Sequence, residues 1–123
     1  MINVPVSNGE LLDKLSILEV KLRHGITEVN EEIDLLINIV EQQWWWKSSF
    51  IGIYFQMLKT INDELWDVED RKRALEQEQC FEEEFIDLAR CVYIINDERA
   101  RVKKLINKYT DSKIFEYKQH REY

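Results

Sequence analysis

The sequence contains few residues that interrupt helices. Three glycines and one proline are present in 123 residues, so long segments run without a residue that ends or kinks a helix. This composition favours helices, so we expect an all-α fold. A chain of this length buries one hydrophobic core, so we expect a single helical domain over residues 1–123.

Reactive and cross-linking side chains are also scarce. The two cysteines, Cys80 and Cys91, would lie about three helical turns apart, which is too far for a disulfide. His24 and His120 are the two histidines, and the sequence has no glycine-rich phosphate loop. These features argue against a histidine metal site and against cysteine catalysis, and they weakly indicate a reducing compartment.

Long apolar runs are absent near the start, where Glu10, Asp13 and Glu19 fall within the first twenty residues. We expect neither a secretory signal nor a membrane span, and therefore a cytoplasmic protein. Residues 1–100 carry 10 basic and 21 acidic side chains, whereas residues 101–123 carry 7 and 3. An acidic body repels nucleic acid and anionic membranes, so the expected partner is another protein or a second copy.

Capping residues and apolar spacing predict the first two helices. Ser7 with Glu10 forms a capping box, stapled by Val6 and Leu11, and begins a helix over about residues 8–24. Gly25 is suited to the left-handed conformation that ends a helix. Thr27 then caps a second apolar pattern, which ends near the triple tryptophan.

The third and fourth apolar patterns keep the four-three spacing of a packed helical seam. They predict an antiparallel hairpin of helices at about 48–78 and 80–110, which completes a four-helix arrangement. Lys72 and Arg99 fall in the seam, where their stems can pack while their charged groups reach solvent. Residues 110–123 are expected to form an extended tail of basic and aromatic residues.

One flank of this hairpin combines polar, aromatic and small residues. At about 100° per residue, Asn62, Trp66 and Glu69 share one side of the third helix. The matching side of the fourth helix carries Tyr93, Asn96 and Lys103. We expect the first helix to dock here, which leaves two interpretations of the polar groups: a satisfied interior network, or a groove that binds a ligand or partner.

The segment "QQWWWKSS" contains three consecutive tryptophans, Trp44, Trp45 and Trp46. The segment is too short to span a membrane, so a role in the core or in a partner contact is expected. Three adjacent side chains cannot all face one core. At least one of them is therefore expected at a subunit or partner interface.

Four carboxylates on the other flank are the candidate ligands of a metal site. They are Glu64, Asp67, Glu84 and Asp87. Mg²⁺ or Mn²⁺ requires several converging oxygen ligands, and all-helical nucleotide pyrophosphohydrolases use acidic pairs on helices in this general way. The simpler interpretation is a solvated face, with Asp63, Asp67 and Asp70 exposed and free of metal.

Three segments also resemble a known group of proteins. These are "VPVSNGELLDKLSILEVK" (4–21), "INDELWDVEDRKR" (61–73) and "FIDLARCVYIINDERARVKKLIN" (85–107). They are similar to an uncharacterised family of short helical proteins from bacteria, tailed phages and other viruses, a domain of unknown function. The family has no established activity, so the resemblance implies no catalytic residues. It does imply that a viral or phage accessory protein is a plausible source.

Two functional hypotheses follow. The first is a non-enzymatic helical interaction protein, as a homodimer or with another protein, that uses its surplus apolar faces. The alternative is a small metal-dependent hydrolase of a nucleotide or other phosphorylated substrate. The net charge of −7 and the missing phosphate loop favour the first.

Overall fold

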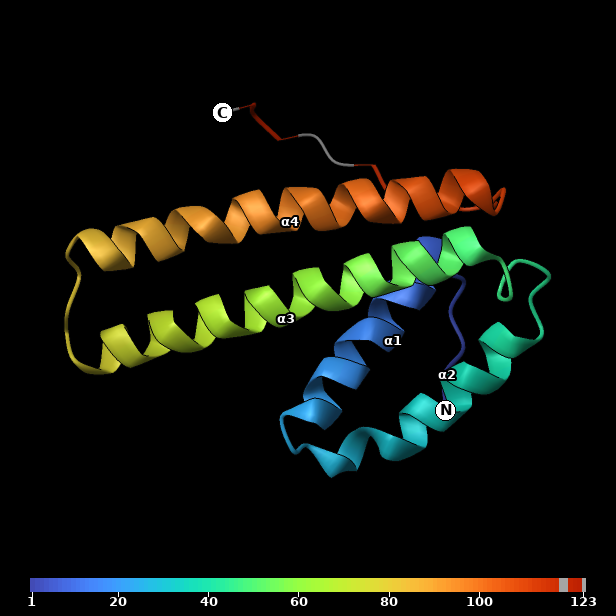
Figure 1. Ribbon diagram of the computed structural model, residues 1–123, viewed down its shortest axis with the longest axis horizontal. Helices are drawn as coiled ribbons and strands as arrows, with labels where there is room; N and C mark the ends of the chain where they lie inside the picture. Colours follow the sequence, from blue (N-terminus) through green and yellow to red (C-terminus); the bar gives the residue numbers. More distant parts are fainter. Residues whose placement is uncertain (118–119, 123) are drawn as a thin grey trace.

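The computed structural model describes residues 1–117 and 120–122. Within these residues the protein contains helices and no strand, which confirms the predicted all-α fold (Figure 1). The elements in chain order are α1 (Asn8–Arg23), the short 3₁₀ helix η1 (Thr27–Val29), α2 (Asn30–Glu41), α3 (Ser49–Gln77) and α4 (Glu83–Tyr109). The predicted tail over 110–123 includes residues 118, 119 and 123, which lie outside the described part.

Helices α3 and α4 form the predicted antiparallel hairpin and are the two longest elements (Figure 1). The observed bounds fall within three residues of the predicted ones because the four-three apolar spacing extends along both helices. Gln79 adopts a positive φ of 56° in the connection. Leu75, Ile95, Val102 and Ile106 are buried along the hairpin.

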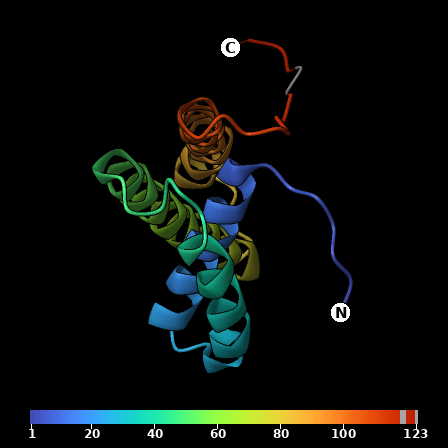
Figure 2. The same ribbon diagram turned by 90° about the vertical axis from the view of Figure 1, so that its right-hand side faces the viewer.

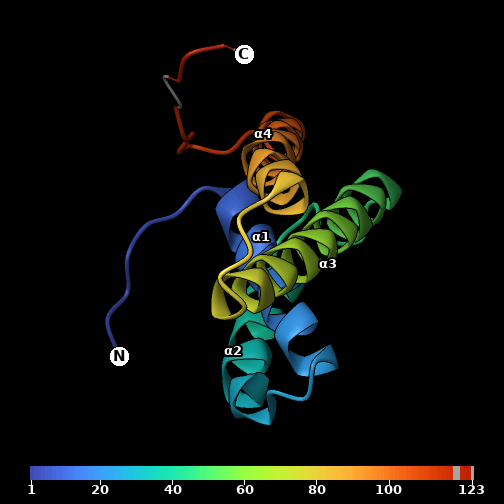
Figure 3. The same cartoon turned by 90° about the vertical axis from the view of Figure 1, so that its left-hand side faces the viewer.

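Helix α1 packs against one half of the hairpin and α2 packs against α1, which leaves the distal half of the hairpin as a two-helix arm (Figure 1). Seen along the hairpin, both lie on one side of α3 and α4, and no other described helix lies on the opposite side (Figures 2 and 3). The core occupies the junction of all four helices. Its central residues include Leu12, Leu15, Trp45, Leu58 and Ile106.

The start of α1 confirms one half of the predicted capping box. The backbone amide of Glu10 donates to the Ser7 Oγ atom at 3.0 Å, so Ser7 is the N-cap. The Glu10 carboxylate does not return to the Ser7 amide and instead binds Lys103 at 2.6 Å. The predicted Thr27 cap is wrong, because Ile26 is the N-cap of η1 and Thr27 lies inside it. Gly25 has a φ of 89°, as expected of a residue that ends a helix.

A membrane-spanning role was not expected from the sequence. Of the helices in the described ranges, none combines the length and the apolar character needed to cross a bilayer.

Candidate functional site

A buried polar network joins α1, α3 and α4 where the three helices meet. The Arg99 guanidinium donates to both carboxylate oxygens of Asp13, with Nε to Oδ1 at 2.9 Å and Nη2 to Oδ2 at 2.6 Å. The Asn62 Nδ2 atom donates to Asp13 Oδ1 at 3.0 Å and to Ser16 Oγ at 2.8 Å. Ser16 in turn donates to the backbone oxygen of Asp13 at 2.7 Å. The network therefore fixes α1 against both helices of the hairpin.

Burial makes this ion pair sensitive to the loss of either partner. The Asp13 side chain is 1% exposed and the Arg99 side chain 25% exposed. The hydrogen bonds to Asp13 raise the pKa of Arg99, outweighing the opposite effect of burial. The expectation that the Arg99 charge reaches solvent is therefore wrong, because its stem packs in the seam while its guanidinium turns toward α1.

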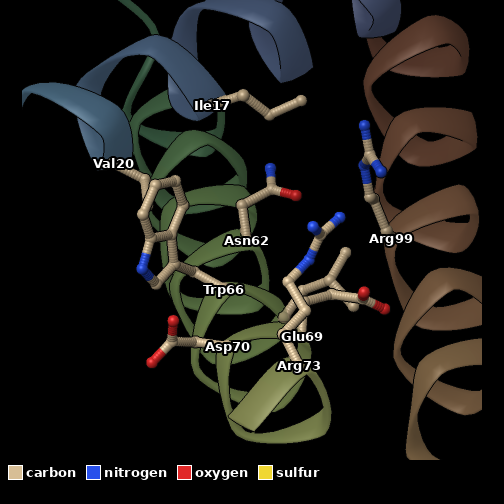
Figure 4. Close-up of a pocket in the computed structure, with 9 residues that line it drawn as sticks. Ile17, Val20, Asn62, Trp66, Glu69, Asp70, Arg73 and Arg99 are labelled. Carbon is tan, nitrogen blue, oxygen red and sulfur yellow. The ribbon is translucent and has the colours of Figure 1, made fainter. Parts of the chain in front are cut away.

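Beside this network lies a pocket of about 480 Å³, which we call the Trp66 pocket (Figure 4). It is lined by Ile17, Val20, Asn62, Leu65, Trp66, Glu69, Asp70, Arg73 and Arg99. Its wall is largely apolar. The Trp66 indole stacks on the His24 ring, with ring centroids 4.3 Å apart and an angle of 13° between the planes. The stacking holds one wall of the pocket in place.

The polar groups of the Trp66 pocket differ in whether they already have partners. Arg99 is bound to Asp13, and the Glu69 carboxylate accepts a contact from Lys72 Nζ at 3.4 Å. Within residues 1–117 and 120–122, neither Arg73 nor Asp70 forms an ion pair or a side-chain hydrogen bond. Figure 4 shows the Arg73 guanidinium extended toward the space between Asn62 and Arg99.

The residues predicted to share one groove are divided by the structure. Asn62, Trp66 and Glu69 line the Trp66 pocket. Asn96 and Lys103 line a second pocket, of about 660 Å³, which also contains Phe115 and Glu116 of the tail and is called the tail pocket here. Arg99 borders both, because its side chain crosses from α4 to α1 between them. Tyr93 is 43% exposed and lines neither pocket.

The tail pocket is built around Lys103. Its Nζ atom binds Glu10 Oε2 at 2.6 Å and Glu116 Oε2 at 2.9 Å. Burial lowers the pKa of Lys103, but the two carboxylates outweigh that effect and raise it. Burial raises the pKa of Glu116, whereas hydrogen bonds from Ser7 and Lys103 lower it by more. These groups satisfy one another, and they attach the tail to the start of α1.

Sequence reasoning missed Gly9, Asp13 and Ser16, although their spacing contained a signal. Together with Val20 they recur at four, three and four residues, which places them on one face of α1. All four are buried. At Gly9 the amide donates to Asn107 Oδ1 at 2.7 Å, and an added Cβ would lie 2.6 Å from the Lys103 carbonyl oxygen. Small residues on this face allow α1 to approach α4 closely.

The four candidate metal ligands are not brought together. Among the described residues, no group of three or more His, Cys, Asp or Glu side chains is placed to hold a metal ion. Glu64, Asp67 and Asp87 are exposed. Glu84 accepts two hydrogen bonds from Arg71, at 2.8 and 3.1 Å, which lower its pKa.

The acids expected on the solvated face are only partly free. Asp67 and Asp70 are exposed, as the spacing predicts. Asp63 is only partly exposed and forms an ion pair with Arg23, with His24 Nε2 at 3.4 Å. Helix α1 approaches this part of α3 closely enough for its last turn to reach Asp63.

The three adjacent tryptophans occupy three different environments. Trp45 is 1% exposed and belongs to the core. Trp46 packs edge-on against Phe55, with ring centroids 5.8 Å apart. Trp44 is 72% exposed. Of the three, only Trp44 is mostly exposed, and the interface role expected for this segment stays a prediction.

Helix α4 also carries an exposed surface. We call it the α4 outer face and define it as Ile94, Glu98, Arg101 and Leu105. At about 100° per residue these side chains lie roughly opposite the side of α4 that contacts α1. Ile94 and Leu105 are each 40% exposed. At about 100° per residue, the exposed apolar residues Phe50, Ile53 and Met57 of α3 also lie roughly opposite the side that contacts α1, and Tyr109 of α4 is exposed as well. Phe50 and Tyr109 are in contact, with ring centroids 5.5 Å apart, so the apolar surface crosses from one helix to the other.

Comparison with known proteins identifies the family. No curated protein and no solved structure matches the chain significantly. The family of unknown function DUF6165 matches residues 2–122, which is nearly the whole chain. This agrees with the resemblance of its three segments to an uncharacterised domain. The chain therefore belongs to the DUF6165 family of unknown function.

Proposed function

We propose that this chain is a non-enzymatic helical interaction protein that acts as a homodimer, joined through the α4 outer face. The observation that carries the proposal is the order of residues on that face. An apolar residue, an acid, a base and an apolar residue follow one another at spacings of four, three and four. This spacing keeps them on one side of a helix.

The order suits a two-fold axis perpendicular to α4. In an isologous interface, each residue before the axis meets the partner's residue equally far beyond it. An axis midway between Arg99 and Ala100 pairs Ile94 with Leu105 of the partner subunit and Glu98 with Arg101 of the partner subunit. Each pair occurs twice. The central charges attract each other, and the apolar residues cover both ends of the contact.

The charge distribution along α4 favours the same antiparallel arrangement. Residues 83–98 contain five acidic side chains and one basic, whereas residues 99–109 contain five basic and none acidic. Antiparallel pairing lays the acidic half of one helix along the basic half of the other. In the part of the chain that the structure describes, Glu98 and Arg101 form no ion pair within the subunit. Both remain available to a second copy.

The exposed apolar residues of α3 add area to this contact. Phe50, Ile53 and Met57 lie on the same side of the hairpin as the α4 outer face, and Tyr109 connects the two surfaces. Apolar area supplies affinity, whereas the charge pairs determine register and orientation. A viral or phage accessory role in the cytoplasm, of the host cell if the chain is viral, belongs to the same proposal.

The metal-dependent hydrolase is not proposed for this fold. Among the described residues, no group of three or more His, Cys, Asp or Glu side chains could hold a metal ion, and Glu84 is already bound to Arg71. No described feature of the arm favours phosphate binding.

Charge reversal tests the dimer directly. Glu98→Arg alone and Arg101→Glu alone each convert both central pairs into repulsive ones. The interaction free energy of each exposed pair changes by about 1 kcal/mol. The two pairs together therefore weaken the dimer by about 2 kcal/mol, or roughly 30-fold in Kd. The double variant Glu98→Arg/Arg101→Glu recreates both attractive pairs and should recover the wild-type Kd.

Sedimentation equilibrium provides the measurement, and Glu28→Arg is the matched control. Glu28 is exposed in η1, far from α4 in the sequence, and it undergoes the same charge reversal. The Kd of the Glu28→Arg dimer should match that of the wild type. A wild-type chain that is monomeric at high micromolar concentration would reject the proposal. If the wild type forms a dimer but neither single reversal changes its Kd, the α4 outer face is not the interface.

A further inference from the structure

The first six residues, MINVPV, form an apolar segment that we call the N-terminal extension. All of them except Asn3 are apolar, and the first charged side chain of the sequence is Glu10. Ile2 is 88% exposed and Val4 is 68% exposed. Within the described residues no hydrogen bond reaches the extension, and Figures 2 and 3 show it directed away from the helices. An exposed apolar segment of this kind indicates a contact with another molecule.

We propose that the N-terminal extension of one chain binds in the Trp66 pocket of a second copy. The pocket offers a concave and largely apolar wall. Its apolar lining comes from α1 and α3 and consists of Ile17, Val20, Leu65 and Trp66 (Figure 4). Association removes the apolar surface of both partners from water. The contact lies outside the α4 outer face, so it goes beyond the proposed dimer and does not depend on it.

The sequence pattern gives the extension one apolar edge. In an extended chain alternate side chains point the same way, which places Ile2, Val4 and Val6 together and Asn3 on the other edge. Pro5 fixes its own φ and holds Val4 in an extended conformation. The segment is therefore partly ordered before it binds. The pocket, of about 480 Å³, falls within the range of about 300–1,000 Å³ that is typical of ligand sites, and it has room for the side chains of Ile2 and Val4.

Both partners of the contact are held in place. Ser7, at the base of the extension, is buried, accepts a hydrogen bond from the Glu10 amide and donates one to Glu116. The extension therefore projects from a fixed point. In the pocket, the Trp66 ring is held by its stacking on His24. Little of either surface has to be ordered on binding, which favours association.

The length of the extension favours a second copy over the chain's own pocket. Ile17 and Val20 lie about 15–20 Å from Ser7 along α1, and six extended residues span about 20 Å. Within one chain, only the first two residues would reach the pocket, and Val4 would stay in water. A second copy can place the start of its α1 beside the pocket, so that both Ile2 and Val4 enter. Two chains that exchange their extensions across a two-fold axis form a closed contact.

Isotope-filtered NMR detects this contact directly. Chains labelled uniformly with ¹³C are mixed with unlabelled chains at about 1 mM, because a contact of few side chains is weak. A cross-peak between a labelled Ile2 or Val4 methyl group and an unlabelled Trp66 ring arises only between two chains, and we expect this cross-peak. Its absence would overturn the inference. A cross-peak that appears only in a fully labelled sample would place the extension in its own pocket and would overturn the inference as well.

Substitutions on each side of the contact test it independently. Ile2→Ser/Val4→Ser removes the apolar edge of the extension, and Ile17→Trp fills the pocket. Both are made in the Glu98→Arg background, which weakens the α4 contact, so that sedimentation equilibrium reports the contact of the extension. Each change should weaken the remaining self-association at least about tenfold, since apolar area is no longer buried.

Leu35→Ser/Ile39→Ser is the matched control for the extension. It makes the same kind of change at two exposed apolar residues of α2 that lie outside both pockets, and it should leave self-association unchanged. Equal effects of the extension variant and the control would overturn the inference. This outcome is distinct from a failure of the α4 dimer, which the charge reversals report.

Discussion

Replacing Asp13 by asparagine tests whether the buried network holds the three helices together. Asp13→Asn keeps the shape of the side chain and removes its charge, which leaves the Arg99 guanidinium without its counter-ion. Breaking a buried ion pair costs about 3–5 kcal/mol. The Arg99 side chain is 25% exposed and regains some hydration, so the lower end, about 3 kcal/mol, is expected. Out of a typical stability of about 5–15 kcal/mol, this is a large loss.

Urea denaturation followed by circular dichroism measures this loss, and Asp67→Asn is the matched control. Asp67 is exposed on α3, so the same chemical change there should alter stability by less than about 0.5 kcal/mol. Arg99→Met should cost less in the Asp13→Asn background than in the wild type, because its partner is already gone. If Asp13→Asn destabilised the protein no more than Asp67→Asn, the ion pair would not hold α1 in place.

Three further predictions concern packing and pH. Gly9→Ala should destabilise the fold by about 1–3 kcal/mol because the new methyl group meets the Lys103 carbonyl. Gly52 lies in open space on α3, so Gly52→Ala should instead stabilise the fold by up to about 1 kcal/mol. Equal effects of the two substitutions in urea denaturation would contradict this prediction. Trp66→Ala should cost about 2 kcal/mol through lost burial and lost stacking on His24, and a thermal midpoint like that of the wild type would count against it. The pKa of Glu116 is lower in the folded protein than in the unfolded chain, so its stabilisation is complete above about pH 5 and is lost as pH falls through the lowered value. Glu116→Gln should remove this part of the pH dependence, and identical pH profiles of unfolding would refute it.

The long hairpin was predictable from the sequence because the apolar spacing that defines its two helices is local. Residues three and four apart along α3 and α4 form the seam, and no distant residue is needed to identify it. For α1, the helical spacing of Leu11, Leu15, Leu18 and Leu22 predicts a single apolar stripe, and this prediction is less accurate. Leu15 and Leu18 are buried as expected, but Leu12, outside that stripe, is fully buried, whereas Leu11 is only partly so. Because α1 packs on three other helices, its apolar surface is wider than one stripe.

The candidate site was predicted only in part, since its central pair depends on distant residues. Asn62 and Trp66 were placed on the correct flank by helical geometry alone. Asp13 is an acid within a helix, and its burial follows from Arg99, 86 residues away. The tail pocket depends on an even longer contact, from Glu116 to Ser7, which are 109 residues apart. The tail has no periodic pattern, so its return to α1 could not be read from the sequence.

One side of α4 has no partner among the described helices, because the helix packs through its other two sides. Ile95, Val102 and Ile106 pack in the core, and Arg99 and Lys103 bind carboxylates of α1. These two contacts fix both the position and the rotation of the helix. The remaining side, with Ile94 and Leu105 at its ends, is therefore presented at a fixed angle and is not shielded by another described helix. A rigid surface loses little conformational freedom on binding, and for this reason even a contact of modest area can be specific.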